Sequence, residues 1–151
     1  MVKLGWVLTV YLCLSFILFV ATSNTINGAI TYFLLLLPFY GIVLLGWWIF
    51  IWRNHTKIAR IKYWIWSIVL VLQFVTILTS PGNCYGVKQG ARCYSNFQIW
   101  FGNVPMTGLS NSVHWKLVED AWLGILGAYG VALVIALLSI SVVKRINAKQ
   151  E

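Results

Sequence analysis

Two cysteines lie in the polar first half of the segment formed by residues 80–120. Cys84 and Cys93 are nine positions apart, whereas a thiol–disulfide enzyme uses a closely spaced Cys-x-x-Cys pair. The spacing therefore argues against a redox centre. In an oxidising compartment outside the cell, where the orientation derived below places this segment, two such cysteines are expected to form a structural disulfide. Closing this loop would stabilise the fold by about 2.5–3 kcal/mol by restricting the unfolded chain. A third cysteine, Cys13, lies within an apolar run and is expected to be a small buried side chain.

A histidine and two carboxylates close the same segment. His114 with Glu119 or Asp120 would make a general base, but hydrolysis also needs a nucleophile, and no nucleophile motif surrounds Ser110 and Ser112. The carboxylates are equally explained by their place at the start of a helix, where the helix dipole favours negative charge. The spacing of His and Cys residues fits no metal site, so no metal or other cofactor is expected.

Four apolar stretches without charged residues must position these groups: residues 4–22, 29–52, 63–79 and 121–143. Each is about as long as the ~20 residues that a helix needs to cross a bilayer. The chain is 60% hydrophobic and 9% charged, too apolar for an ordinary soluble domain. We therefore expect an all-α membrane protein in which residues 1–151 form one domain, a bundle of four transmembrane helices.

The basic residues set the expected orientation. With a cytoplasmic amino terminus, three cations lie outside (Lys88, Arg92 and Lys116) and eight lie inside: Lys3, Arg53, Lys57, Arg60, Lys62, Lys144, Arg145 and Lys149. This asymmetry predicts a multi-pass protein of the plasma (inner) membrane, with both termini, including the tail 144–151, in the cytoplasm and residues 80–120 outside. The net charge of +8 is then an orientation signal, and no nucleic-acid partner is expected.

The first apolar stretch also has the features of a signal peptide. Lys3, the apolar run and the small residues Ala21-Thr22-Ser23 resemble a leader with its cleavage site. Because the run is longer than a usual signal core, a retained first helix is expected. Cleavage would leave three helices and an external amino terminus.

The cytoplasmic loop 53–62 carries four of the cations, Arg53, Lys57, Arg60 and Lys62. Each would gain about 1 kcal/mol at an anionic leaflet, so lipid headgroups are the expected contact and an acidic partner surface is the alternative.

The nine tryptophans map to the two membrane interfaces and none maps to the membrane centre, which is typical of anchoring side chains.

The apolar stretches contain no Asp, Glu, Lys, Arg or His, which argues against a proton-coupled pump. Gln73 is the one amide deep in a stretch, and we expect it to hydrogen-bond between helices, with substrate contact as the alternative.

Pro38 predicts a kink in the second helix, because proline removes a backbone donor and clashes with the preceding turn. The kink is either structural or part of a cavity or hinge.

The last apolar stretch contains a ridge of small residues. Small residues recur every four positions in the last stretch, at Gly124, Ala128, Ala132 and Ala136, and such a ridge lets helix backbones approach closely. The helix that packs against this ridge is expected to belong to the same chain, to a second copy or to a larger subunit.

The apolar run 96–101, with Trp100 and Phe101, is expected to lie along the outer interface, cap the bundle or dock on a partner.

These patterns favour a non-catalytic plasma-membrane protein that acts by protein association. An accessory or assembly subunit, a membrane sensor and an immunity protein would all use these features, with a membrane-protein partner or a homo-oligomer in the lipid bilayer. One alternative is an oligomeric channel or transporter component for a neutral or lipophilic solute, in which Pro38 and Gln73 line a pathway. The other is a membrane enzyme acting on a lipid or quinone at the outer surface through His114 and a carboxylate.

Overall fold

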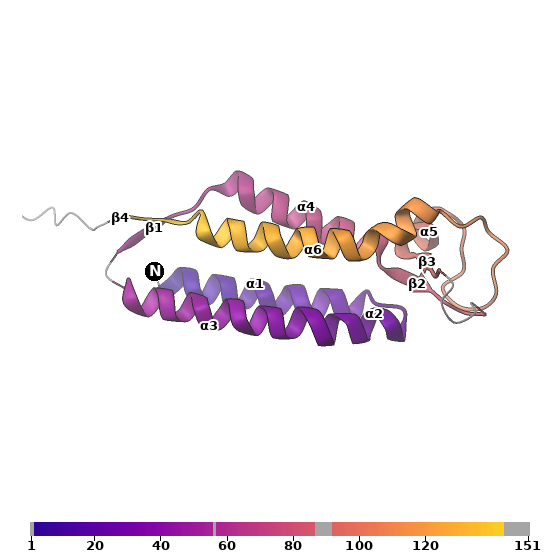
Figure 1. Ribbon diagram of the computed structural model, residues 1–151, viewed down its shortest axis with the longest axis horizontal. Helices are drawn as coiled ribbons and strands as arrows, with labels where there is room; N and C mark the ends of the chain where they lie inside the picture. Colours follow the sequence, from indigo (N-terminus) through magenta and orange to yellow (C-terminus); the bar gives the residue numbers. More distant parts are fainter. Residues whose placement is uncertain (1, 56, 87–91, 144–151) are drawn as a thin grey trace, which may run out of the picture.

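The computed structural model describes residues 2–55, 57–86 and 92–143, and four long helices run along its longest axis (Figure 1). They are α1 (Val2–Ala21), a continuous helix made of α2 (Ile26–Thr31), η1 (Tyr32–Leu36) and α3 (Leu37–Arg53), α4 (Tyr63–Thr79), and α6 (Lys116–Leu138). Three of these, α1, α2–η1–α3 and α6, are long and apolar enough to cross a membrane. The fourth, α4, is apolar but has 17 residues, and it packs closely along α6.

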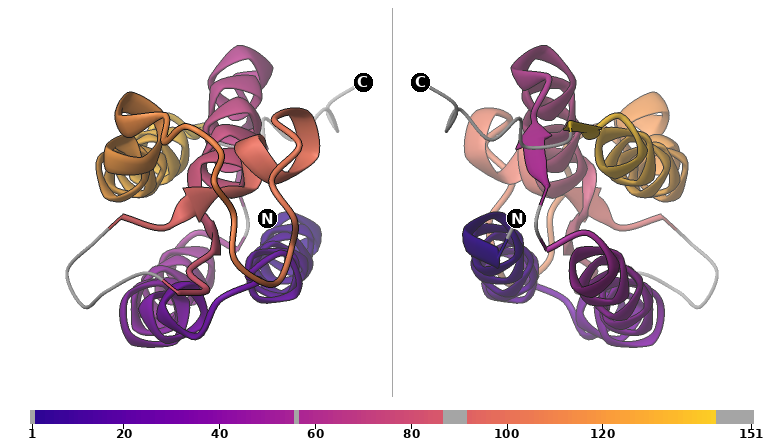
Figure 2. Two further views of the ribbon diagram at one scale, coloured as in Figure 1. Left: turned by 90° about the vertical axis from the view of Figure 1, so that its right-hand side faces the viewer. Right: turned by 90° about the vertical axis from the view of Figure 1, so that its left-hand side faces the viewer.

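The two ends of the bundle differ in structure. Figure 1 places the amino terminus, β1 (Ile58–Arg60) and β4 (Ser141–Val143) together at one end, where β1 and β4 pair antiparallel. The opposite end carries β2 (Pro81–Asn83), β3 (Tyr94–Ser95) and the short helix α5 (Asn96–Phe101). We call these the basic end and the cap end. Seen along the bundle, the four long helices surround a common axis (Figure 2).

The helix expected at 121–143 has different bounds. It begins at Lys116, because the polar residues before the apolar stretch continue the helix and Glu119 accepts a hydrogen bond from the backbone N–H of Trp115 (3.1 Å). It ends at Leu138, and residues 141–143 pair with β1. The tail 144–151 and Lys88 lie outside the described residues.

The core is apolar and draws on all four long helices. Its most buried apolar side chains include Leu12, Phe19, Tyr32, Val69, Tyr129 and Leu133. The outer faces are apolar as well, since Leu14, Ile42, Val71 and Val131 are each 60% or more exposed. Helices that are apolar on every side are typical of a lipid environment, which agrees with a membrane protein.

Pro38 lies just after a π-helical turn. Proline has no N–H to donate to the carbonyl four residues earlier, and its ring clashes with that carbonyl. The backbone widens in η1, where the N–H of Leu37 donates to the carbonyl oxygen of Tyr32, five residues back. The proline is therefore accommodated within one continuous helix.

The expected burial of Cys13 is wrong, because this free cysteine is exposed on the outside of α1. The buried positions of α1 recur every three or four residues, at Gly5, Leu8, Leu12, Ser15 and Phe19. Cys13 follows the inward-facing Leu12 by one residue, which turns it about 100° away from the core.

Candidate functional site

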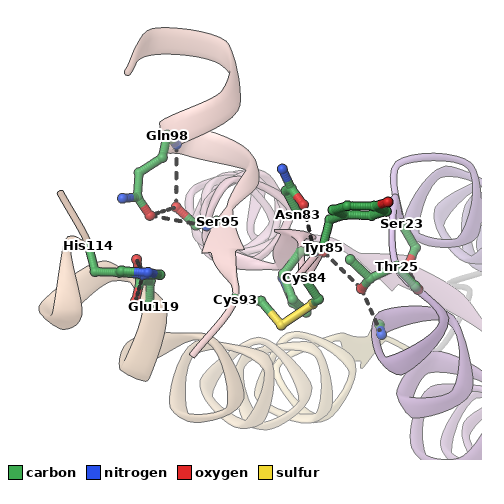
Figure 3. The surroundings of a disulfide bond; sticks show 12 residues. Ser23, Thr25, Asn83, Cys84, Tyr85, Cys93, Ser95, Gln98, His114 and Glu119 are labelled. Atoms are coloured by element: carbon green, nitrogen blue, oxygen red, sulfur yellow. Dashed lines mark hydrogen bonds and ion pairs between the residues drawn. A yellow bond between two sulfur atoms is a disulfide. The ribbon is translucent and has the colours of Figure 1, made fainter. Parts of the chain in front are cut away.

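The cap end gathers most of the polar side chains that the sequence marked as candidates (Figure 3). Cys84 and Cys93 form a disulfide, with their Cα atoms 4.5 Å apart, which confirms the predicted pairing. The bond joins the residue after β2 to the residue before β3, so it fixes this two-stranded sheet covalently.

Helix α5 is held at its start by a capping box. The hydroxyl of Ser95 accepts from the backbone N–H of Gln98 (3.4 Å), and the Gln98 side-chain oxygen accepts from the backbone N–H of Ser95 (3.1 Å). The Gln98 amide nitrogen also donates to the carbonyl oxygen of Val113 (3.1 Å). Both side chains are buried, so α5 is tied to the segment that leads into α6.

Asn96 connects α5 to the ends of two long helices. Its fully buried amide nitrogen donates to the carbonyl oxygens of Thr22 (3.0 Å) and Ile77 (3.1 Å) and to the hydroxyl of Ser80 (2.8 Å). Its oxygen accepts from the Asn24 amide (3.1 Å). One side chain therefore satisfies carbonyls at the ends of α1 and α4, which have no partner inside their own helices.

A cavity of about 310 Å³ opens between the α1–α2 connection and the loop around β2. Neutral polar side chains contribute to its lining, among them Asn24, Asn27, Tyr85 and Thr107, and no charged side chain of the described residues does so. Its wall is held in place by buried Asn83, whose amide donates to the carbonyl oxygens of Pro105 (2.7 Å) and Gly108 (3.2 Å).

His114 and Glu119 lie together, as a general-base pair would require. His114 Nδ1 is 3.0 Å from Glu119 Oε1, the Glu119 side chain is only 1% exposed, and the Tyr94 ring stacks on the imidazole with centroids 4.0 Å apart. Asp120 instead forms an ion pair with Arg92.

Ser110 and Ser112 do not complete a catalytic site. The Ser110 hydroxyl donates to that of Ser112 (3.0 Å), and neither hydroxyl bonds to His114 within the part of the chain that the structure describes. Neither serine is therefore held as a nucleophile against the histidine and the carboxylate.

The run 96–101 buries its amides and exposes its aromatic side chains. Trp100 is 43% exposed and Phe101 is 66% exposed, while the Phe97 ring packs against Phe101 (5.1 Å between centroids) and Trp115 (5.5 Å). We call Phe97, Trp100, Phe101 and Trp115 the aromatic cap surface. The segment thus covers the bundle with one face and presents an apolar face outward.

A second polar cluster lies in the middle of the bundle. Ser15 Oγ is 2.8 Å from the hydroxyl of Tyr40 and 3.2 Å from that of Tyr129, and these two tyrosines also hydrogen-bond to each other. Tyr11 donates to the side-chain oxygen of Gln73 (2.9 Å) and lies 3.4 Å from the Tyr129 hydroxyl. All four long helices contribute. Sequence reasoning identified only Gln73, although hydroxyl groups inside apolar stretches were the signal for the others.

No protein-family model, curated protein or solved structure matches this chain. Within residues 2–55, 57–86 and 92–143, no three His, Cys, Asp or Glu side chains group as metal ligands.

The small-residue ridge of α6 is divided between the core and the surface. Ala136 is fully buried and Ala132 packs against the core, whereas Gly124 and Ala128 are exposed. A Cβ atom added at Gly124 would meet no atom within 4 Å. One half of the ridge packs within the chain, and the other half is open.

The four cations of the loop 53–62 lie at the basic end. Arg53 ends α3, Arg60 lies in β1 and Lys62 directly precedes α4. Lys57 Nζ donates to the side-chain oxygen of Asn54 (2.7 Å). Among the described residues none of the four pairs with a carboxylate, so their charges remain available to a headgroup or a partner.

Proposed function

We propose that this protein is a non-enzymatic, four-span protein of the plasma membrane that acts by association with another membrane protein. Its cap end lies outside and its basic end, with both chain termini, lies in the cytoplasm. The observation that carries the proposal is the aromatic cap surface, in which Trp100 and Phe101 are exposed on a segment held by buried amides.

The rigidity of the cap supports this proposal. The Cys84–Cys93 disulfide and the hydrogen bonds of Asn96 and Gln98 fix the segment before any partner binds. A preorganised surface loses less conformational entropy on association than a mobile loop. Tryptophan and other large aromatic side chains also contribute most to protein interfaces.

The exposed half of the α6 ridge offers a second contact inside the membrane. At Gly124 and Ala128 the helix backbone is open to the outside of the bundle. Helices associate in lipid through close backbone packing at such small residues. A partner with one transmembrane helix along α6 and an extracytoplasmic part on the cap would use both surfaces, as an accessory or assembly subunit requires.

Two observations weigh against the alternatives. The hydroxyls of Ser15, Tyr40 and Tyr129 bond to one another rather than facing an open path, which favours a structural role over a solute pathway. The His114–Glu119 pair has no nucleophile bonded to it in the described ranges. That arrangement favours a role in fixing the start of α6 over hydrolysis.

Site-specific photo-crosslinking in the native membrane tests the proposal. A photo-reactive amino acid replaces Phe101, Ala128 or, as the matched control, Val71, an exposed residue of α4 (60%). We expect crosslinks to one protein of defined mass from positions 101 and 128 but not from position 71. Crosslinks to lipid alone at positions 101 and 128 would refute association, and a product of twice the chain mass would identify a second copy as the partner.

A further inference from the structure

A second cavity, at the basic end, draws its walls from all four long helices. Its volume is about 230 Å³, and no polar atom of the residues that the structure describes contributes to its surface. Its lining includes Leu4 and Val7 of α1, Trp47 of α3, Tyr63 and Leu70 of α4, and Leu137 of α6. Val7, Tyr63 and Leu70 are 64%, 79% and 53% exposed, so the cavity opens to the outside of the bundle, where lipid chains would lie.

Two lysines are next in sequence to residues that line this cavity. Lys3 precedes the lining residue Leu4, and Lys62 stands between the lining residues Ile61 and Tyr63. Neither lysine forms an ion pair among the described residues. The carboxylates that the structure describes, Glu119 and Asp120, lie at the start of α6 beside the cap, so nothing described near the cavity neutralises this charge.

We propose that this cavity binds one acyl chain of an anionic phospholipid, whose phosphate is held by Lys3 and Lys62. A purely apolar slot selects a hydrocarbon chain, and cations at its rim select a negative headgroup at the same depth. Helix α4 also begins at the lining residue Tyr63 without a side-chain cap, and the first backbone N–H groups of a helix have no carbonyl partner within it. A membrane lipid combines the chain and the charge in one molecule.

The dimensions of the cavity support a chain over other occupants. A transmembrane helix with its side chains is about 10–12 Å across, too wide for a slot of about 230 Å³ among four packed helices. An uncharged lipophilic molecule would leave the lysines unused. The inference is independent of the proposed protein partner, because it concerns the opposite end of the bundle.

Lipid retention by the purified full-length protein tests this site. The delipidated protein in mild detergent is titrated with dioleoyl phosphatidylglycerol or with dioleoyl phosphatidylcholine, and native mass spectrometry counts the bound lipids. We expect one equivalent of phosphatidylglycerol to bind at least tenfold more tightly than phosphatidylcholine. Replacing both lysines, Lys3→Gln with Lys62→Gln, should weaken its binding more than tenfold, at about fivefold per cation.

Lys57→Gln is the matched control, because it removes one charge at the same end from a residue that lies four positions from the nearest lining residue of its loop, Ile61, whereas Lys62 directly follows it. We expect its binding to stay within twofold of the natural protein. An equal loss with Lys57→Gln and with Lys62→Gln alone would show diffuse attraction and overturn the site. Equal affinity for the two lipids would overturn the headgroup assignment.

Cavity-filling variants test the position of the acyl chain. Val7→Phe and Leu70→Phe add volume at the exposed mouth, where a larger side chain leaves the core packing intact. Both should reduce phosphatidylglycerol binding by fivefold or more while the helical circular dichroism signal and the melting temperature are kept. Full binding by both folded variants would place the chain elsewhere and contradict the proposal.

Discussion

The hydroxyl groups of Tyr40 and Tyr129 hydrogen-bond to each other in the centre of the bundle and so join α3 to α6. Ser15 of α1 bonds to both tyrosines, and Tyr11 connects the cluster to Gln73 of α4. An unpaired polar group is costly in an apolar interior, and the four helices must meet in this arrangement to satisfy all five side chains. The cluster therefore specifies how the bundle assembles.

Removing the central hydroxyl should weaken the bundle. In Tyr129→Phe the hydroxyls of Ser15, Tyr40 and Tyr11 each lose a neighbour, while the ring keeps its packing. We expect the free energy of unfolding to fall by about 1–2 kcal/mol. Unfolding by sodium dodecyl sulfate in mixed micelles, followed by tryptophan fluorescence, measures the change.

Tyr32→Phe is the matched control for this prediction. Tyr32 is as fully buried as Tyr129, but its hydroxyl has no partner in the described part of the chain. Removing it should leave the unfolding free energy unchanged or raise it, because no hydrogen bond is lost. Equal losses in both variants would show that the cluster contributes nothing beyond ring packing.

The helices and the disulfide were predictable from local patterns, whereas the central polar cluster was not. The length of an apolar stretch and the spacing of two cysteines can each be read from one short segment of the sequence. Which face of a helix turns inward is normally read from alternating apolar and polar sides, and here both sides are apolar. The hydroxyl groups of Tyr40 and Tyr129 inside apolar stretches indicate that each needs a hydrogen-bond partner, but the local sequence does not indicate that they meet each other. Gln73 was recognised only because an amide is conspicuous in such a stretch.

The buried side of residues 96–101 could not be predicted from the local sequence either. Residues 96–101 looked apolar as a run, and the sequence left open whether they cap or dock. Their buried side consists of Asn96, which donates to carbonyl groups at the ends of α1 and α4, and Gln98, which donates to the carbonyl oxygen of Val113. Thr22 lies 74 positions from Asn96, so this contact appears only when the chain is folded.

Asn96→Asp should destabilise the cap. The substitution keeps the shape of the side chain but replaces its donor with an oxygen facing the carbonyls of Thr22 and Ile77. We expect the unfolding free energy to fall by about 2–3 kcal/mol, because a buried group loses its partners. Thermal unfolding in detergent measures it, with Asn111→Asp at an exposed position as the control. A change no larger than the control's would contradict the assigned role of Asn96.

The disulfide should stabilise the protein because it restricts the conformations of the unfolded chain. Replacing both cysteines, Cys84→Ser with Cys93→Ser, removes the closed loop and should lower the unfolding free energy by about 2.5–3 kcal/mol. Cys13→Ser changes an exposed free thiol and should have no effect in the same denaturation experiment. If the double variant unfolded like the natural protein, the loop would already be restrained by its other contacts.

The proposed orientation is tested by cysteine labelling in intact cells. In a Cys13→Ser background, Thr107→Cys at the cap end should react with a membrane-impermeant maleimide from outside. Lys57→Cys at the basic end should react only after permeabilisation. Both positions are exposed, so the difference would report the side of the membrane and not burial. The opposite pattern would invert the orientation.

The divided ridge of α6 predicts opposite results at two alanines. Ala136 is fully buried, so Ala136→Leu forces extra carbon atoms into packed surroundings and should cost about 1–3 kcal/mol of unfolding free energy. Ala128 is exposed, and Ala128→Leu should leave the stability of the purified chain unchanged while removing the crosslink expected at position 101. If Ala128→Leu destabilised the purified chain as much as Ala136→Leu, both halves of the ridge would pack within the chain. The membrane contact along α6 would then have to lie on another face.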